Sequence, residues 1–183
     1  MKKTTKFLLG GVLGILLLIP VSQAKADWHQ DNVGWWYSLN NGSYYKNTEA
    51  KINGKWYKFD ERGYMMTGWQ LIWERNDSRW GIIKNWSYFD PVNGDKKLGW
   101  QNIDGKWYYF KYSAVKGSRE IDGKFYYFDS VNCDMKTGWL VLNGSRYYAD
   151  PNDGGAFASN KTLIIDGVSY TFDIGGSVIN NEP

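Results

Sequence analysis

Residues 99–110 read Gly-Trp-Gln-Asn-Ile-Asp-Gly-Lys-Trp-Tyr-Tyr-Phe, and this stretch decides the fold. Its Asp-Gly pair stands between two β-prone runs, which is the strongest short-range signal for a β-hairpin. Related copies occur at residues 53–60 and 122–129. Self-similarity at a short period indicates a repeat architecture, in which each unit buries its apolar face against its neighbours.

Seven such units can be counted in the chain. Their aromatic strand cores lie at residues 42–45, 56–59, 86–89, 107–110, 125–128, 146–149 and 169–172. No stretch after residue 26 keeps a helical apolar period. Because a lone two-stranded hairpin is marginal in water, we expect the hairpins to stack head to tail. The predicted fold class is therefore all-β, a solenoid of stacked β-hairpins.

One segment departs from the repeat. The Gly-Trp tryptophan Trp69 is 17 residues before the next strand tryptophan, Trp86, whereas seven residues separate Trp100 from Trp107. The extra residues fall near 70–85 and carry further tryptophans. We expect this insertion to be an ordered excursion of its hairpin and a candidate partner-specific surface.

The first 26 residues have the three parts of a secretory signal peptide. Basic residues precede an apolar run at residues 7–20, and Ala24-Lys25-Ala26 matches a cleavage site. The run is shorter than the roughly 20 residues that a membrane-spanning helix needs. We expect a signal helix, residues 1–26, that is cleaved on export and leaves a domain of residues 27–183. Residues 179–183 carry no sorting signal, so we expect non-covalent attachment at the bacterial surface.

The charge and the reactive residues exclude several function classes. Removal of residues 1–26 takes four lysines, which leaves 18 basic against 19 acidic residues and argues against nucleic-acid binding. Cys133 and His29 are the only residues of their kinds. An internal disulfide is therefore impossible, and a His-based triad or a zinc site is disfavoured. We expect no metal, no cofactor and no enzymatic activity.

The aromatic content points to a ligand. The chain holds 11 Trp, 14 Tyr and 8 Phe, more than a core of this size needs. Aromatic faces bind quaternary ammonium groups by cation–π attraction, and they also stack on sugar rings. We expect the strand phenylalanines Phe59, Phe89, Phe110 and Phe128 to form the core. The Gly-Trp tryptophans recur at unit junctions, where we expect them to contact ligand.

These units resemble the choline-binding (cell-wall-binding) repeat family of Gram-positive bacteria. The resemblance rests on Gly68-Trp69 and on residues 53–57, 99–110 and 129–139, and it covers nearly all of residues 34–180. It implies a left-handed β-solenoid with choline sites between consecutive hairpins. Each site would take a Gly-Trp tryptophan, the following strand tryptophan and a tyrosine of the next hairpin.

By position, the resemblance implies three complete sites. They are Trp100 with Trp107 and Tyr126, Trp69 with Trp86 and Tyr108, and Trp35 with Tyr44 and Tyr57, where Tyr44 replaces the expected tryptophan. Either of two adjacent tyrosines, such as Tyr126 or Tyr127, could complete a site. Met66 and Met135 match the turn methionine of the family, a soft apolar wall for a site.

The remaining junctions depart from the pattern. Trp139 is a fourth candidate, but its strand partner is Arg146, a fixed cation that should repel a cationic ligand. Glu49 and Ser118 stand where a Gly-Trp tryptophan is expected, so we expect those junctions to be empty or weak.

The favoured function is a secreted surface protein, held non-covalently on the cell wall through phosphocholine of teichoic or lipoteichoic acid. It could act as an adhesin or regulator and present residues 70–85 to a host or bacterial surface protein. The alternative is a lectin-like module that binds glucan or another polysaccharide with the same rings. A wall hydrolase is disfavoured, because the insertion offers only Glu74 and Asp77 as catalytic carboxylates. No nucleic-acid partner and no membrane span after cleavage are expected.

Overall fold

The computed structural model describes residues 25–79 and 81–182. The predicted signal peptide therefore lies almost entirely outside the described residues. Within them, every regular element is a β-strand except one short 3₁₀ turn, η1 (Pro151–Asp153). The prediction of an all-β protein is confirmed.

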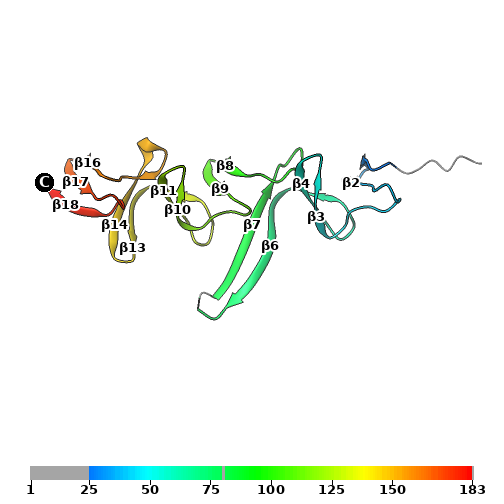
Figure 1. The fold of residues 1–183 in the computed structure, drawn as a ribbon, viewed down its shortest axis with the longest axis horizontal. Coiled ribbons are helices and arrows are strands. Elements are labelled where there is room, and N and C mark those ends of the chain that lie inside the picture. The colour runs from blue at the N-terminus through cyan, green and yellow to red at the C-terminus, as the bar shows by residue number, and fades with distance from the viewer. Residues whose placement is uncertain (1–24, 80, 183) are drawn as a thin grey trace, which may run out of the picture.

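The described residues contain seven antiparallel hairpins, which follow one another along the long axis of the molecule (Figure 1). They are β1 (Trp28–Gln30) with β2 (Trp35–Tyr37), β3 (Thr48–Ile52) with β4 (Lys55–Phe59), β6 (Gly68–Asp77) with β7 (Gly81–Phe89), β8 (Gly99–Ile103) with β9 (Lys106–Phe110), β10 (Gly117–Ile121) with β11 (Lys124–Phe128), β13 (Gly138–Leu142) with β14 (Ser145–Asp150), and β16 (Lys161–Ile165) with β17 (Val168–Phe172).

Four of these hairpins gain a third strand. The added strands are β5 (Met65–Met66), β12 (Met135–Lys136), β15 (Ala156–Phe157) and β18 (Val178–Glu182). Each pairs with the second strand of its hairpin. A hairpin and its return strand therefore form one repeated unit.

The hairpin turns have the backbone that their residues favour. Asp104 and Gly105, between β8 and β9, have φ angles of 52° and 78°. Two successive positive φ angles are the requirement of a type I′ turn, which Asn-Gly and Asp-Gly pairs meet at low cost. The β-turn predicted from the Asp-Gly pair in residues 99–110 is therefore present in the structure.

The core is a row of phenylalanines, one from each of five hairpins. Phe59, Phe89, Phe110, Phe128 and Phe172 are each at most 2% exposed, which confirms the core role predicted for the first four. At Phe59, Phe110, Phe128 and Phe172, a tryptophan of the preceding hairpin packs on the phenylalanine ring. These ring contacts join neighbouring hairpins, because each hairpin alone has too little surface to bury.

Two ring pairs illustrate the contact. The centroids of Trp69 and Phe110 are 5.6 Å apart, and those of Trp100 and Phe128 are 5.7 Å apart. Both distances lie in the range where aromatic pairs add about 0.5–1.5 kcal/mol to the energy of area burial.

The hairpin of β6 and β7 is much longer than the others and projects away from the molecular axis (Figure 1). The insertion near residues 70–85 forms this projection, which we call the arm. A register shift between Leu71 and Trp73 marks where the arm leaves the repeat. Trp73 and Ile82 on the arm are 44% and 64% exposed.

The first hairpin lies elsewhere than the sequence suggested. Residues 42–45 were expected to form its strand core, but β1 and β2 form the hairpin and Tyr44 makes only an isolated bridge with Ser38. The reason is a turn at residues 31–34. The Asp31 carboxylate accepts hydrogen bonds from the backbone N–H groups of Val33 (2.8 Å) and Gly34 (3.1 Å), as in an Asx turn. Gly34 therefore closes a turn and does not open a new unit.

Candidate ligand-binding cages

Four hairpins carry a tryptophan on the first strand, directly opposite a tyrosine on the second. The tryptophans are Trp28, Trp69, Trp100 and Trp139. Each indole also meets a tyrosine of the next hairpin at a steep angle. The centroid distances for these four contacts are 4.8, 4.9, 4.8 and 4.6 Å. An indole and a phenol ring thus form a corner at each of these junctions.

The Trp100 cage consists of Trp100, Trp107 and Tyr126. The ring of Trp107 lies 6.4 Å from that of Trp100 at 81°, which adds a third wall to the corner. The three residues line one cavity of about 500 Å³, together with Met135 and Thr137. The structure thus brings this predicted triad together. Among the described residues that line the cavity, none is charged.

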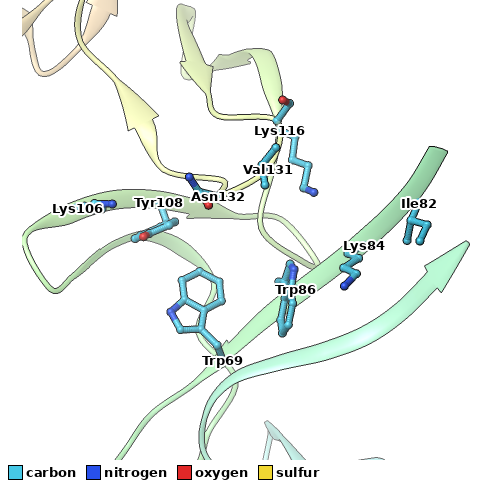
Figure 2. Close-up of a pocket in the computed structure, with 10 residues that line it drawn as sticks. Trp69, Ile82, Lys84, Trp86, Lys106, Tyr108, Lys116, Val131 and Asn132 are labelled. Carbon is cyan, nitrogen blue, oxygen red and sulfur yellow. The ribbon is translucent and has the colours of Figure 1, made fainter. Parts of the chain in front are cut away.

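The Trp69 cage consists of Trp69, Trp86 and Tyr108 and opens into a cavity of about 590 Å³ (Figure 2). The predicted triad lies together although the arm interrupts the hairpin. Trp86 still pairs with Leu71, which is the register that Trp107 has with Asn102. The extra residues lie beyond this pair. Tyr108 is 8% exposed, and this burial raises the pKa of its phenol.

The Trp28 cage consists of Trp28, Trp35 and Tyr57. These residues line a cavity of about 650 Å³, with Met65 beside them. Trp28 was missed in the sequence because aspartate, not glycine, precedes it. A signal was present, since Trp28 and Trp35 are seven residues apart, as Trp100 and Trp107 are.

Tyr44, predicted with Trp35 and Tyr57, lies in a different place. Its ring is 6.0 Å from that of Trp36, and the two line a separate cavity of about 270 Å³ with Arg62 and Tyr64. Neighbouring side chains of a strand point to opposite faces. Trp35 and Trp36 therefore serve different surfaces, and Tyr44 belongs with Trp36.

The fourth corner, formed by Trp139 and Tyr170, holds a cation of the protein itself. The guanidinium carbon of Arg146 lies 4.4 Å from the ring centroid of Trp139 and 5.6 Å from that of Tyr170. Arg146 pairs with Val141, so it occupies the strand position that Trp107 has in the Trp100 cage. We call this arrangement the Trp139 corner.

The junction at Glu49 has an ion pair in place of an aromatic corner. Glu49 faces Lys58 across its hairpin, as Trp100 faces Tyr109. Its Oε2 atom lies 2.9 Å from the Lys96 Nζ atom, and both side chains are largely buried. At the second departure, Ser118 is exposed and faces Tyr127.

Each cage also receives a wall from the loop two hairpins further along the chain. Val92 and Asn93 line the Trp28 cavity, Val131 and Asn132 the Trp69 cavity, and Pro151 the Trp100 cavity. Three consecutive hairpins therefore build one cage.

An aspartate opens each of these loops and holds it in shape. The Asp90 carboxylate accepts hydrogen bonds from the Val92 and Asn93 backbone N–H groups at 2.9 and 2.8 Å. The N–H group of Asn93, the Lys97 ammonium and the N–H group of Val92 together lower the pKa of Asp90 to about 2. Asp129 makes the same two backbone contacts, which lower its pKa.

No group of three or more His, Cys, Asp or Glu side chains among the described residues could hold a metal ion. The His29 ring stacks on Trp36 at 4.2 Å. The Cys133 thiol is buried, which raises its pKa and disfavours the reactive thiolate. The same residues contain no helix with the length and hydrophobicity to span a membrane.

The geometry defines a class of protein, an all-β repeat protein with aromatic cages at the junctions of its hairpins. Two family models match the chain. One, described as a choline-binding repeat, matches residues 115–161, and the other, a putative cell wall binding repeat, matches residues 50–65 and 99–113. Residues 50–65, 99–113 and 115–161 therefore carry repeats of the choline-binding (cell-wall-binding) type.

Solved structures agree with this assignment. Choline binding protein F from Streptococcus pneumoniae, crystallised with a peptidoglycan analogue, is 37% identical with a TM-score of 0.69, over 84% of this chain and 46% of that one. CbpJ from the same species is 34% identical with a TM-score of 0.69, over 85% and 48% of the two chains. The chain thus spans slightly less than half the length of these relatives.

A curated enzyme also contains a related stretch. Glucosyltransferase-S of Streptococcus downei is 29% identical over 95 residues, which are 48% of this chain and 6% of that protein.

Proposed function

We propose that the protein binds choline in the Trp28, Trp69 and Trp100 cages, and that these cages hold it non-covalently on the cell wall through phosphocholine of teichoic acids. The observation that carries the proposal is the threefold recurrence of two indoles and one phenol around an open cavity. A trimethylammonium group fits such walls, because it needs aromatic faces and offers no hydrogen-bond donor.

The lining of the Trp100 cavity favours a quaternary ammonium group over a sugar. Besides the three rings, Met135 and Pro151 contribute apolar walls, and Thr137 contributes a hydroxyl group. A sugar needs several polar side chains for its hydroxyl groups, because unpaired buried polar groups cost free energy. A cation without N–H groups has no such need.

Firm attachment follows from several weak cages. Cation–π contacts contribute about 0.5–2 kcal/mol each, so a single cage should bind choline weakly. Cages on one chain that face a polymer with many choline groups bind it with a high effective concentration. We therefore propose anchoring by multivalency.

The proposal extends to the whole chain. Residues 1–26 serve as a cleaved export signal, and residues 27–183 form one wall-binding domain whose hairpins stack as a β-solenoid. The ring contacts between consecutive hairpins support this stacking. The exported protein acts by binding and not by catalysis, and its arm presents Trp73 and Ile82 to a protein partner in an adhesin or regulatory role.

The test is retention of residues 27–183 on a resin that bears a choline-like quaternary ammonium group. We expect elution by millimolar free choline, with a change in tryptophan fluorescence. The same chain with Trp35, Trp86 and Trp107 all changed to alanine is the matched control and should not be retained. Release of the unchanged protein by salt alone would mean ion exchange and would reject the choline assignment.

Glucan binding is the second candidate, and the similarity to glucosyltransferase-S favours it. Sugar stacking uses the same indole faces, so the aromatic walls alone suit both ligands. Free choline distinguishes them, since it competes for a choline cage and leaves a glucan site occupied. Retention on immobilised α-glucan in the presence of choline would move this candidate to first place.

A further inference from the structure

The three cages differ in the charge around them. Three lysines, Lys84, Lys106 and Lys116, line the cavity of the Trp69 cage, and the described residues lining it include no carboxylate. In Figure 2, Lys84 and Lys116 lie on the side of Trp86, and Lys106 lies beyond Tyr108. The cavity of the Trp28 cage has Lys55 alone, and no charged side chain lines that of the Trp100 cage among the described residues.

Lys106 belongs to a set of equivalent lysines. Lys55, Lys106 and Lys124 each begin the second strand of the hairpin that gives a cage its tyrosine. The Nζ atom of Lys55 lies 3.6 Å from the Asp95 carboxylate, and that of Lys124 lies 2.6 Å from the Asp153 carboxylate. For Lys106, the described residues provide no carboxylate within 4.0 Å.

A single residue explains the difference from Lys124. Asp153 is the third residue after Asp150, which opens its loop, and Asn132 is the third residue after Asp129. Asn132 reaches the Trp69 cavity but carries no charge. The carboxylate two residues later, Asp134, is held by Lys136 at 2.9 Å. Among the described residues that line the cavity, Lys106 therefore has no counter-ion.

Lys116 is also specific to this cage. It precedes Gly117 at the start of β10, where Thr137 precedes Gly138 at the start of β13. Thr137 lines the uncharged Trp100 cavity. The third lysine, Lys84, comes from the arm, which no other hairpin has, and its only carboxylate partner among the described residues is Glu74 at 3.9 Å.

Three cations beside an aromatic cage disfavour a ligand that is only a cation, because like charges repel. They favour a ligand that carries an anion next to its ammonium group. In phosphocholine, a two-carbon chain separates the trimethylammonium group from the phosphate. A cavity of about 590 Å³ that extends from the aromatic walls to Ile82 on the arm has room for both groups.

We propose that the Trp69 cage is a phosphocholine site, in which the aromatic walls take the trimethylammonium group while Lys84 and Lys116, on the Trp86 side, take the phosphate of the wall polymer, and Lys106 adds to the positive potential of the cavity. This inference rests on the proposed choline-binding function, and it assigns binding of the phosphate group to the Trp69 cage. The Trp28 and Trp100 cages bind the trimethylammonium group alone.

The test resolves the cages within the intact chain. Residues 27–183 are labelled with 5-fluorotryptophan, and the ¹⁹F signals of Trp86 and Trp107 are assigned by single Trp→Phe substitutions. Titrations with choline, phosphocholine and inorganic phosphate at low salt then give a Kd for each cage. At Trp86, we expect phosphocholine to bind about five- to tenfold more tightly than choline, because an exposed charge pair is worth up to about 1 kcal/mol. At Trp107, we expect the two Kd values to agree within about twofold.

Two variants sharpen the test. Lys116→Thr installs the residue of the uncharged cavity, and Asn132→Asp supplies Lys106 with the carboxylate that Lys124 has. Each should reduce the preference for phosphocholine at Trp86 to about twofold and strengthen choline binding slightly, since a repelling charge is removed or neutralised. Neither should move the ratio at Trp107. The preference should also weaken at 0.15 M salt, where the Debye length is about 8 Å.

The outcomes separate the two proposals. Equal Kd values for choline and phosphocholine at both tryptophans would overturn the phosphate site and leave choline binding intact. Absence of any choline response at both would reject the proposed function itself. Inorganic phosphate binding as tightly as phosphocholine at Trp86 would overturn the coupling of the two groups. Retention of the protein on phosphatidylcholine vesicles but not on choline-bearing walls would overturn the assignment of the phosphate to the wall polymer.

Discussion

The Trp100 cage and the Trp139 corner have the same arrangement of rings, but the first is an open cavity and the second holds an arginine side chain. Each begins with a tryptophan opposite a tyrosine of its own hairpin and beside a tyrosine of the next, at 4.8 and 4.6 Å. The two sites differ at one strand position, which Trp107 occupies in the first and Arg146 in the second. Trp107 leaves the first open as a cavity, whereas Arg146 places a guanidinium 4.4 Å from the second indole.

The comparison shows that the repeat serves two purposes with one framework. The corner of indole and phenol joins consecutive hairpins whether or not a ligand binds. The residue two before the second-strand tyrosine decides whether the corner stays open, as at Trp107, or receives a cation of the chain, as at Arg146. In the proposed function, the open corner takes its cation from the ligand. A cation–π contact with a guanidinium has the same physical origin as one with a quaternary ammonium ligand. Substitutions in the Trp100 cage and in the Trp139 corner test this comparison.

The largest effect is expected from Trp100→Ala. It removes a wall of the cage and a ring that packs on the buried Phe128 at 5.7 Å. We expect a loss of about 3 kcal/mol in the free energy of unfolding, because large aromatic side chains cost this much on truncation. Chemical denaturation measures it. Trp73→Ala on the exposed arm should stay within about 0.5 kcal/mol, and an equal loss there would contradict the role of Trp100 in joining hairpins.

The next effect concerns the methionine wall of the Trp100 cage. A Cβ atom at Gly155 would lie 2.5 Å from the Met135 Cε atom, and φ there is +84°. Gly155→Ala should lower the free energy of unfolding by about 1–2 kcal/mol through backbone strain and should displace Met135.

Gly144→Ala is the matched control for that change. Gly144 has a φ of +85° in the hairpin turn of the same repeated unit, with nothing within 4 Å of an added Cβ atom. It should show the strain without weaker choline binding. Equal choline affinities of the two variants would show that Met135 is not a functional wall.

Trp107→Ala removes the wall that distinguishes the open cage. Trp107 is 46% exposed, so stability should change little. Choline affinity at this cage should fall about tenfold, since one cation–π contact is worth about 0.5–2 kcal/mol. Isothermal titration calorimetry checks it. Trp56 is 44% exposed at the equivalent strand position, but its junction has Glu49, so Trp56→Ala should leave choline binding as it is.

Arg146→Ala probes the closed corner. It should lower the free energy of unfolding by about 0.5–1 kcal/mol, as expected for an exposed cation–π contact. A decrease of this size shifts Tm by a few degrees in a chain of this length, which differential scanning calorimetry resolves. Arg146→Trp restores the residue of the open cages and should add one choline-binding event. A stoichiometry unchanged by Arg146→Trp would mean that Arg146 is not what closes the corner.

The smallest effect concerns acid. The pKa of Asp90 is lowered to about 2 by its hydrogen bonds to the loop that lines the Trp28 cage. A carboxylate with a depressed folded-state pKa stabilises the fold fully above its unfolded-state pKa, near 4, and loses that contribution as the pH falls through its folded-state pKa. The Tm difference between the unchanged protein and Asp90→Asn should hold from pH 7 to 5 and shrink below about pH 4. A difference that grew on acidification would refute the assigned role.

Much of the site could be predicted because the signals are local. The Asp-Gly turn of residues 104–105 and the seven-residue spacing of Trp100 and Trp107 follow from the chain alone. The position of the Tyr44 side chain could not be predicted in this way. An Asx turn at Asp31 shifts the first hairpin, and a change of strand face then separates Tyr44 from Trp35.

The sequence by itself determined the all-β class, the hairpin turns, the buried phenylalanines and the pairing of tryptophans with cages, because these depend on residue periodicity and turn chemistry within one or two units. Only the tertiary structure decided that Trp28 opens the first cage, that a loop two hairpins away completes each cage, and that Lys106 lacks the counter-ion that Lys124 has. Those features depend on contacts between side chains of three different hairpins, and the separation of two residues along the chain does not determine whether they are in contact.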